Sequence, residues 1–243
     1  MEVGKVRTYS GSLGVMALVI LLSGCPSELD DKQAAKIVET KKDEKAVKAA
    51  DDKGDKAAGD KAAGDKAAGD KAAMTGWQVD LATSKLHAVG SKVTGDHSVF
   101  FQKYEGALDV KDSKATGISF SVEMNEFTTE MGDSDMGGKL VSHLKSPDFF
   151  DVKNHALSTF KSTKITEGNS AAGSHTVEGD LTMRGVTKRI SFAADIKVEA
   201  KAATGVANFT INRQDFGIKY PGKKDNLIKD NVLMKLDFKF VQK

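Results

Sequence analysis

Residues 232–240 read VLMKLDFKF, and this stretch decides the fold class. Apolar side chains occupy every second position, and lysine or aspartate fills most of the positions between them. A period of two places alternate side chains on opposite faces of a β-strand, one face buried and the other in water. Residues 118–124 and 190–198 repeat the same alternation. The sequence therefore predicts an all-β domain.

Shorter candidate strands surround these three, with Gly, Asn and Asp in the gaps. They span residues 77–80, 85–91, 99–110, 159–165, 177–183 and 207–212. Within residues 137–151 the spacing of Leu140, Val141 and Leu144 is helical instead, which predicts one short helix that ends before Pro147. About eight antiparallel strands with one helix form a closed barrel or a sandwich, and composition does not choose between them.

The N-terminal residues have a different character. Two basic residues precede an apolar run at residues 13–22, and Leu-Ser-Gly then precedes Cys25. This order is typical of a secretory signal, and the run is shorter than the roughly 20 residues that span a bilayer. We therefore predict a signal peptide at residues 1–24. The alternative is an uncleaved anchor helix that ends in a free cysteine.

Leu-Ser-Gly-Cys at residues 22–25 resembles the lipobox of bacterial lipoproteins. The resemblance implies that the signal is cut before Cys25 and that this residue carries the acyl chains, which anchor the protein stably to a membrane. Pro26 stands where aspartate is the usual inner-membrane retention signal, so the resemblance favours the outer membrane, facing the periplasm. Cys25 is the only cysteine in the chain, so the exported domain is predicted to be without disulfides.

Residues 25–73 form a low-complexity segment rich in Ala, Lys and Asp, and they include no aromatic residue. The sequence Gly-Asp-Lys-Ala-Ala repeats from Gly54 to Ala73. Such a composition cannot bury enough apolar surface to offset its chain entropy, so we predict a disordered tether, partly helical within residues 32–50. A solenoid is the alternative, but so short a repeat with only alanine as apolar residue builds no stacked core.

Four stretches, in order, resemble the YceI family of polyisoprenoid-binding proteins. They are HLKSPDFFDV at residues 143–152, FKSTKI at 160–165, VEGDLTMRGVTKRISF at 177–192 and FTINRQDFGI at 209–218. The resemblance covers residues 77–241. It implies that residues 74–243 fold into an eight-stranded antiparallel, lipocalin-like barrel that holds an apolar lipid, such as a polyisoprenoid, in its interior.

Inward-facing apolar side chains are the predicted ligand contacts. These are Phe120, Phe127, Phe149, Phe160, Phe192, Ile211, Met234 and Phe238. His143 and Arg213 are candidate polar contacts at the cavity mouth, and Arg213 could instead form an ion pair with Asp215 on the barrel wall. The residues by themselves favour a filled core, whereas the resemblance favours a lipid-shaped cavity, so both interpretations stay open.

Sequence features of other protein classes are missing. The chain has no nucleophile elbow, phosphate-binding glycine loop or HExxH helix, its histidines are not spaced as metal ligands, and residues 133–144 depart from a calcium loop. A net charge of +2 without a basic, aromatic-rich stripe argues against nucleic-acid binding. We therefore expect no enzyme, no catalytic residue, no metal and no cofactor.

Two functions remain. One is a membrane-anchored, extracytoplasmic carrier or sequestering protein for an isoprenoid-type lipid. The other is a structural or stress-related envelope protein whose barrel is filled and which acts through protein partners. The sequence does not predict an oligomeric state.

Overall fold

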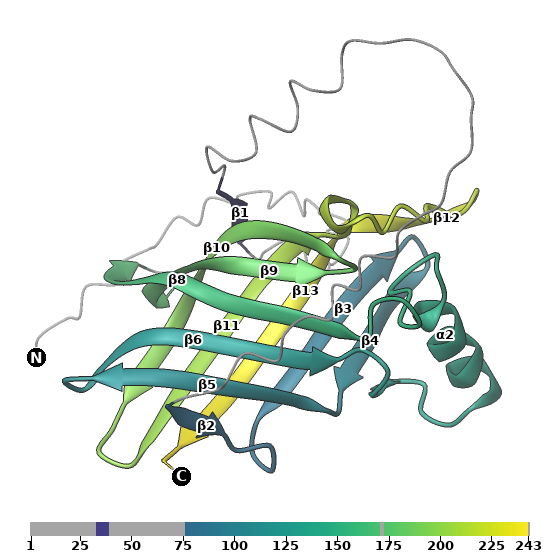
Figure 1. The fold of residues 1–243 in the computed structure, drawn as a ribbon. Coiled ribbons are helices and arrows are strands. Elements are labelled where there is room, and N and C mark those ends of the chain that lie inside the picture. The colour runs from purple at the N-terminus through teal and green to yellow at the C-terminus, as the bar shows by residue number, and fades with distance from the viewer. Residues whose placement is uncertain (1–32, 39–75, 171–172, 243) are drawn as a thin grey trace, which may run out of the picture.

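A computed structural model of the chain describes residues 33–38, 76–170 and 173–242 (Figure 1). The predicted signal peptide, Cys25 and the Gly-Asp-Lys-Ala-Ala repeat lie outside the described residues, as does most of the predicted tether. No helix among the described residues is long and apolar enough to cross a membrane.

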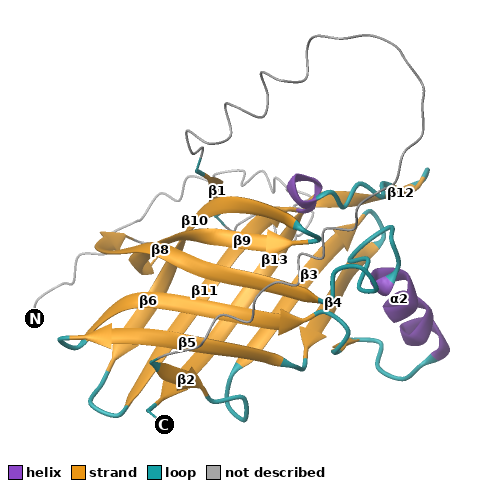
Figure 2. Cartoon of the chain, in the orientation of Figure 1, coloured by secondary structure: helices purple, strands orange, loops and turns teal. Residues whose placement is uncertain are grey.

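Eight strands form a closed antiparallel ring (Figures 1 and 2). They are β2 (Trp77–Val79), β5 (Tyr104–Lys111), β6 (Lys114–Glu123), β8 (Leu157–Ser170), β9 (Gly173–Met183), β10 (Val186–Val198), β11 (Ala202–Asn212) and β13 (Asn226–Val241). Each pairs with the next in the order β2-β5-β6-β8-β9-β10-β11-β13, and Phe240 of β13 pairs with Val79 of β2 to close the ring. The predicted eight-stranded antiparallel barrel is confirmed, and the sandwich alternative is wrong.

A side sheet extends the wall beside β13. β3 (Lys85–Lys92) pairs with β13, β4 (Gly95–Phe101) with β3, and β7 (Phe127–Thr129) with β4. The sequence predicted one strand over residues 99–110, but the chain breaks between β4 and β5, where the Gln102 N–H donates to Glu126 O at 2.8 Å. The break lets β4 join the side sheet while β5 joins the ring.

The predicted short helix is present as α2 (Asp135–Lys145), which packs at the end of the side sheet (Figure 2). The Ser134 side chain caps its first turn by accepting a hydrogen bond from the Gly137 N–H, as N-cap serines do. Leu144 is buried, and the helix stops at Ser146, just before Pro147. A 3-10 turn (Arg213–Phe216) and β12 (Gly222–Lys223) connect β11 to β13.

Part of the predicted tether is structured. Residues 33–38 (QAAKIV) lie against the barrel, where β1 (Lys36–Ile37) pairs with β10 and Ala34 forms a bridge with Thr210 of β11. For these residues the expected disorder or helix differs from the structure. The reason is tertiary: backbone hydrogen bonds to Thr210 of β11 and Arg189 of β10 hold this segment as an added strand.

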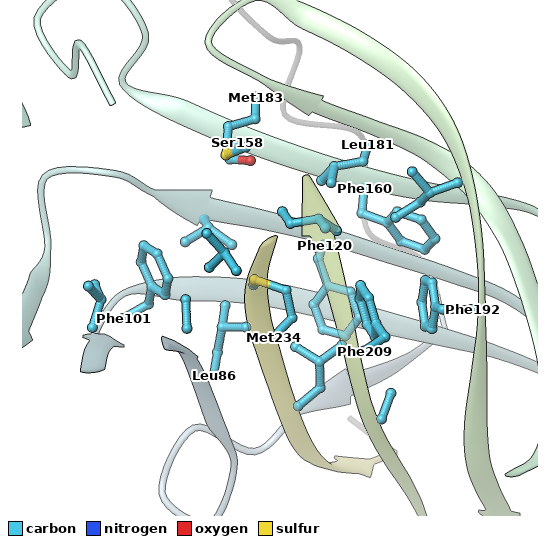
Figure 3. Close-up of a pocket in the computed structure, with 18 of the residues that line it drawn as sticks. Leu86, Phe101, Phe120, Ser158, Phe160, Leu181, Met183, Phe192, Phe209 and Met234 are labelled. Atoms are coloured by element: carbon cyan, nitrogen blue, oxygen red, sulfur yellow. The ribbon is translucent and has the colours of Figure 1, made fainter. Parts of the chain in front are cut away.

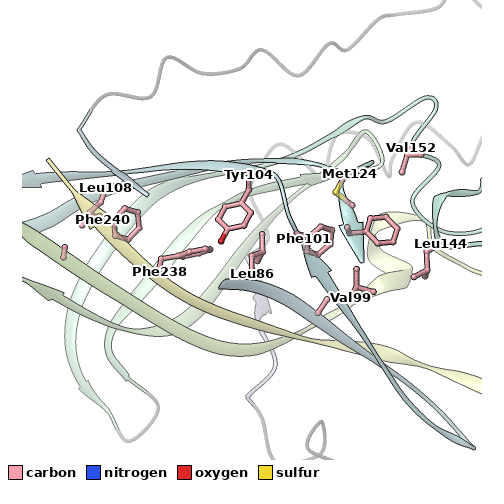
Figure 4. Close-up of a cluster of buried hydrophobic side chains, with 13 residues drawn as sticks. Leu86, Val99, Phe101, Tyr104, Leu108, Met124, Leu144, Val152, Phe238 and Phe240 are labelled. Carbon is pink, nitrogen blue, oxygen red and sulfur yellow. The ribbon is translucent and has the colours of Figure 1, made fainter. Parts of the chain in front are cut away.

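The side chains inside the wall form two apolar clusters that meet along the barrel. One gathers at β3, β4, β5 and the end of β13, and includes Tyr104, whose ring lies 5.8 Å from that of Phe238 (Figure 4). The other gathers between β9, β10 and β11, around Val177 and Ile190. Both clusters share bordering side chains that are only partly buried, among them Ile118 and Met234. These partly buried side chains face the cavity described next.

Candidate ligand-binding cavity

The barrel encloses a cavity of about 260 Å³, lined almost wholly by apolar side chains (Figure 3). Its lining comes from ring strands together with β3, β4 and α2. Alternate residues of each strand supply it, as in Phe120 and Val122 of β6 or Phe209 and Ile211 of β11. The volume lies just below the roughly 300–1,000 Å³ that is usual for small-molecule sites.

The structure brings most of the predicted ligand contacts together in this lining. Phe120, Phe149, Phe160, Phe192, Ile211, Met234 and Phe238 all border the cavity. Phe127 does not: it belongs to β7, outside the ring, and its ring packs on Phe150 at 5.8 Å and Phe101 at 6.1 Å. Contact between these side chains and a ligand remains a prediction.

Aromatic pairs give the cavity wall its shape. Phe192 and Phe209 stack with ring centroids 4.1 Å apart and planes 15° from parallel, and Phe160 approaches Phe192 at 5.7 Å (Figure 3). Sequence reasoning missed Phe209 as a site residue. The sequence did contain a signal for Phe209, because it stands two positions before the predicted Ile211 and therefore lies on the same face of the strand.

Two glycines make room for the rings on neighbouring strands. A Cβ at Gly106 would lie 2.2 Å from the ring of Phe120, its cross-strand partner. A Cβ at Gly179 would lie 2.4 Å from the ring of Phe160. Both rings can therefore lie against bare backbone, which is the close approach that glycine permits. The sequence offered no signal for these positions, because the pairing register sets them.

Polar side chains join the lining at one end, near the β3–β4 hairpin. Lys92 and His97 are partly exposed there, and the Ser91 hydroxyl donates to Asp96. The His97 Nδ1 lies 2.6 Å from Glu130 Oε1. Burial acts to raise the pKa of Glu130, but hydrogen bonds from His97 and from backbone N–H groups outweigh it and hold that pKa below its ordinary value. This end can receive the polar group of an otherwise apolar ligand.

Arg213 lies at the same end, and only 3% of it is exposed. Its guanidinium donates to the carbonyl oxygens of Ile218 (2.7 Å), Lys229 (3.1 Å) and Ile228 (3.3 Å). It also pairs with Asp230 at 3.0 Å, so the suggested ion pair with Asp215 is wrong. These bonds tie the start of β13 to the 3-10 turn, so Arg213 has a structural role as well as a place in the lining.

His143 lies one layer behind the cavity. It is absent from the lining, and its Nε2 lies 3.1 Å from Asp148 Oδ2. The imidazole packs edge-on against Phe149 at 5.0 Å and Tyr220 at 4.8 Å. Through Phe149, which does border the cavity, His143 can orient the lining rather than form it.

Within the described ranges, no group of three or more His, Cys, Asp or Glu side chains is arranged to hold a metal ion. Three of the polar groups at the cavity end are engaged with protein partners: His97 with Glu130, Ser91 with Asp96, and Arg213 with carbonyls and Asp230. The arrangement is suited to enclosing an apolar molecule.

A closed eight-stranded antiparallel barrel around an apolar cavity defines a lipocalin-like barrel protein. Residues 77–240 match the family model described as a YceI-like domain. The chain therefore belongs to the YceI-like family.

Two relatives are similar to this chain in sequence. A UPF0312 protein of Pseudomonas putida (strain F1) is 33% identical over 129 residues, which are 50% of this chain and 64% of that protein. The match thus spans less than two thirds of that relative. The UPF0312 protein SA2479 of Staphylococcus aureus is 28% identical over 179 residues, 69% of this chain and 94% of that protein.

Two solved structures share the fold. BcnA of Burkholderia cenocepacia superposes with a TM-score of 0.56 at 22% identity, over 66% of this chain and 98% of that one. A polyisoprenoid binding domain from Saccharophagus degradans, implicated in plant cell wall breakdown, gives a TM-score of 0.51 at 13% identity, over 69% and 98% of the two chains. At these identities the likeness concerns the fold alone.

Proposed function

We propose that this protein holds an apolar, isoprenoid-type lipid inside its barrel, as a carrier or sequestering protein. The observation that carries the proposal is the apolar cavity of about 260 Å³. A ring of eight strands leaves room for one small ligand, and an unfilled apolar interior favours the carrier over a filled barrel that acts only through partners. The polyisoprenoid binding domain with the same fold supports the choice of ligand class.

The physical chemistry of the cavity suits such a ligand. A water molecule is poorly stabilised in this cavity, because a buried water needs two to four hydrogen-bonding partners and this lining offers few. Each methylene that leaves water for this interior gains about 0.8 kcal/mol. A polyisoprenoid chain supplies many such groups and has at most one polar end, which the region of Lys92 and His97 can receive.

The proposal includes a cellular location. We infer that acyl chains on Cys25 hold the barrel at a membrane outside the cytoplasm, with the outer membrane favoured because Pro26 follows the cysteine. The lipobox resemblance is the support for this step. Cys25→Ser should abolish labelling by radioactive palmitate and leave an unprocessed precursor, and normal labelling of that variant would overturn the lipoprotein assignment.

A blocking variant tests whether a ligand occupies the cavity. Gly90 borders the cavity, and a Cβ added there meets no atom within 4 Å, so a side chain can start at this position and the indole of Gly90→Trp should take up cavity space. Gly138 of α2 is equally free of neighbours but lies outside the lining, so Gly138→Trp is the matched control.

The probe is retinol, a fluorescent isoprenoid alcohol, titrated into the purified full-length chain. Gly90→Trp should weaken retinol binding by about tenfold or more, a cost of about 1.4 kcal/mol, and Gly138→Trp should leave it unchanged. Equal affinities for the unaltered protein and both variants would place the ligand elsewhere.

A further inference from the structure

The barrel wall is split along one seam. β10 and β11 pair only near their hairpin, where residues 195–198 of β10 face residues 203–206 of β11. Beyond it, residues 186–194 of β10 pair with β9 and residues 207–212 of β11 pair with β13. Within the described residues, no ladder joins these two stretches directly to each other.

Residues 33–38, hereafter the strap, lie at this seam, where β1 runs beside β10 and Ala34 forms a bridge with Thr210 of β11 (Figure 1). On the β11 side, the Ala35 N–H donates to Thr210 O at 2.7 Å, and the Thr210 N–H donates to Gln33 O at 3.2 Å. On the β10 side, the Val38 N–H donates to Arg189 O at 2.8 Å. The strap therefore forms hydrogen bonds with both β10 and β11 and completes the wall as an added strand.

The seam opens onto the ligand cavity. Ile190 of β10 and Ile211 of β11 border the 260 Å³ cavity on its inner side. The same two side chains also line a smaller cavity of about 70 Å³, together with Ala35 and Ile37 of the strap. At this place the two isoleucines, the strap and the buried Phe216 of the 3-10 turn lie between the ligand cavity and the outer surface.

The strap is held more weakly than the strands beside it. It is six residues long, and only Lys36 and Ile37 form a regular ladder, against residues of β10. Ile37 keeps 42% of its surface exposed. Segments with few buried contacts and few backbone hydrogen bonds open locally at a small free-energy cost.

The position of the strap in the chain places the seam close to Cys25, the predicted lipid anchor. Gln33 is eight positions after Cys25, and eight extended residues span at most about 28 Å. A docked strap therefore keeps the seam within that distance of a lipidated cysteine, even though the predicted tether continues to residue 73.

From these observations we propose that the seam between β10 and β11 is the lateral portal through which the apolar ligand enters from the membrane, and that the strap is its closing strand. This inference rests on the proposed function. When the strap detaches, residues 186–194 of β10 and residues 207–212 of β11 move apart beside Ile190 and Ile211. The apolar chain of the ligand then passes between the two strands. When it docks, its hydrogen bonds to Thr210 and Arg189 reseal the wall.

Two opposite variants of the full-length chain test the portal. Ala35→Pro with Val38→Pro removes the two N–H groups that the strap donates to Thr210 and Arg189, and should open the seam. Lys36→Cys with Ser191→Cys should lock it, because these cross-strand partners lie outside the lining at a spacing that suits a disulfide. Ala62→Pro with Ala67→Pro, in the repeat, is the control for the proline pair.

The measurement is the rate of retinol transfer from the protein to vesicles of phosphatidylethanolamine and phosphatidylglycerol. The strap prolines should raise that rate by about tenfold or more, as expected when local opening no longer limits release. The oxidised cysteine pair should lower it by a similar factor until a reductant restores it, and the repeat prolines should leave it unchanged.

The outcomes separate the two claims. If the unaltered protein binds retinol but the opened, locked and control forms release it at one rate, the portal is wrong and the proposed function stands. If the unaltered protein binds no retinol, the proposed function fails and the portal fails with it.

Discussion

Phe192 shows how an inward side chain serves a cavity rather than a filled core. Its ring is only half-buried although it lies inside the barrel, because one face meets Phe209 and another part borders the cavity. Phe127 is 5% exposed and packs against Phe101 and Phe150, outside the cavity lining. The two phenylalanines therefore form a matched pair.

Truncation should separate the roles of these two rings. Phe127→Ala should cost the empty protein about 3–5 kcal/mol of unfolding free energy, the usual cost for a buried phenylalanine. Phe192→Ala should cost the empty protein less but the loaded protein more, since a ligand stabilises only the folded state that binds it. Urea unfolding with and without saturating retinol measures both, and an equal retinol-induced stabilisation in the two variants would contradict this account.

At the residue scale, the alternating pattern predicts which side chains face inward, because a strand with one buried face has no other arrangement. The alternating pattern fails for Phe127. Whether a strand belongs to the ring or to the side sheet depends on which strand it pairs with, and that partner can be far away in the sequence. The same holds for Arg213: its type suggested a polar contact, but only the folded turn shows that its donors are occupied by Ile218, Ile228 and Lys229.

At the scale of elements, the β9–β10 ladder carries a measurable charge interaction. Arg189 and Asp180 are cross-strand partners, and the guanidinium donates twice to the carboxylate, at 2.6 and 2.8 Å. Those hydrogen bonds lower the pKa of Asp180 below its ordinary value. The Asp180 side chain is 39% exposed, so water screens the pair and limits its contribution to stability.

The pair should give a pH-dependent contribution of known sign. A carboxyl whose folded pKa is depressed stabilises the protein above its unfolded pKa of about 3.9, and the contribution disappears as pH falls through the lower folded value. Asp180→Asn should therefore cost less than about 1 kcal/mol at pH 7 and nothing near pH 2. Urea unfolding at both pH values measures this, and a cost that persists at the lower pH would mean that the aspartate acts through something other than its charge.

Elements differ in how far the sequence predicts them. The long alternating stretches and the helix before Pro147 follow from local patterns, and both are present. The break after Phe101 and the docking of the strap do not, because each depends on which strand edge is free elsewhere in the barrel. A six-residue segment such as QAAKIV has too little pattern of its own to indicate a strand.

At the scale of the whole molecule, ring closure positions the site. Composition left a barrel and a sandwich open, and the family resemblance favoured the barrel. Closure then turns one face of every ring strand toward a common interior, so residues as distant as Phe120 and Met234 border one cavity. Whether that interior is filled depends on side-chain packing between strands, which no single stretch of sequence encodes.

The central claim is that the interior holds one apolar chain, and copurification tests it most directly. The full-length protein is purified from membranes of its own host, weighed by native mass spectrometry, extracted with organic solvent and weighed again. The account predicts one added mass per barrel before extraction, its loss afterwards, and an isoprenoid-type molecule in the extract. A protein that has its bare lipoprotein mass from the start, with an extract free of any such molecule, would contradict the account.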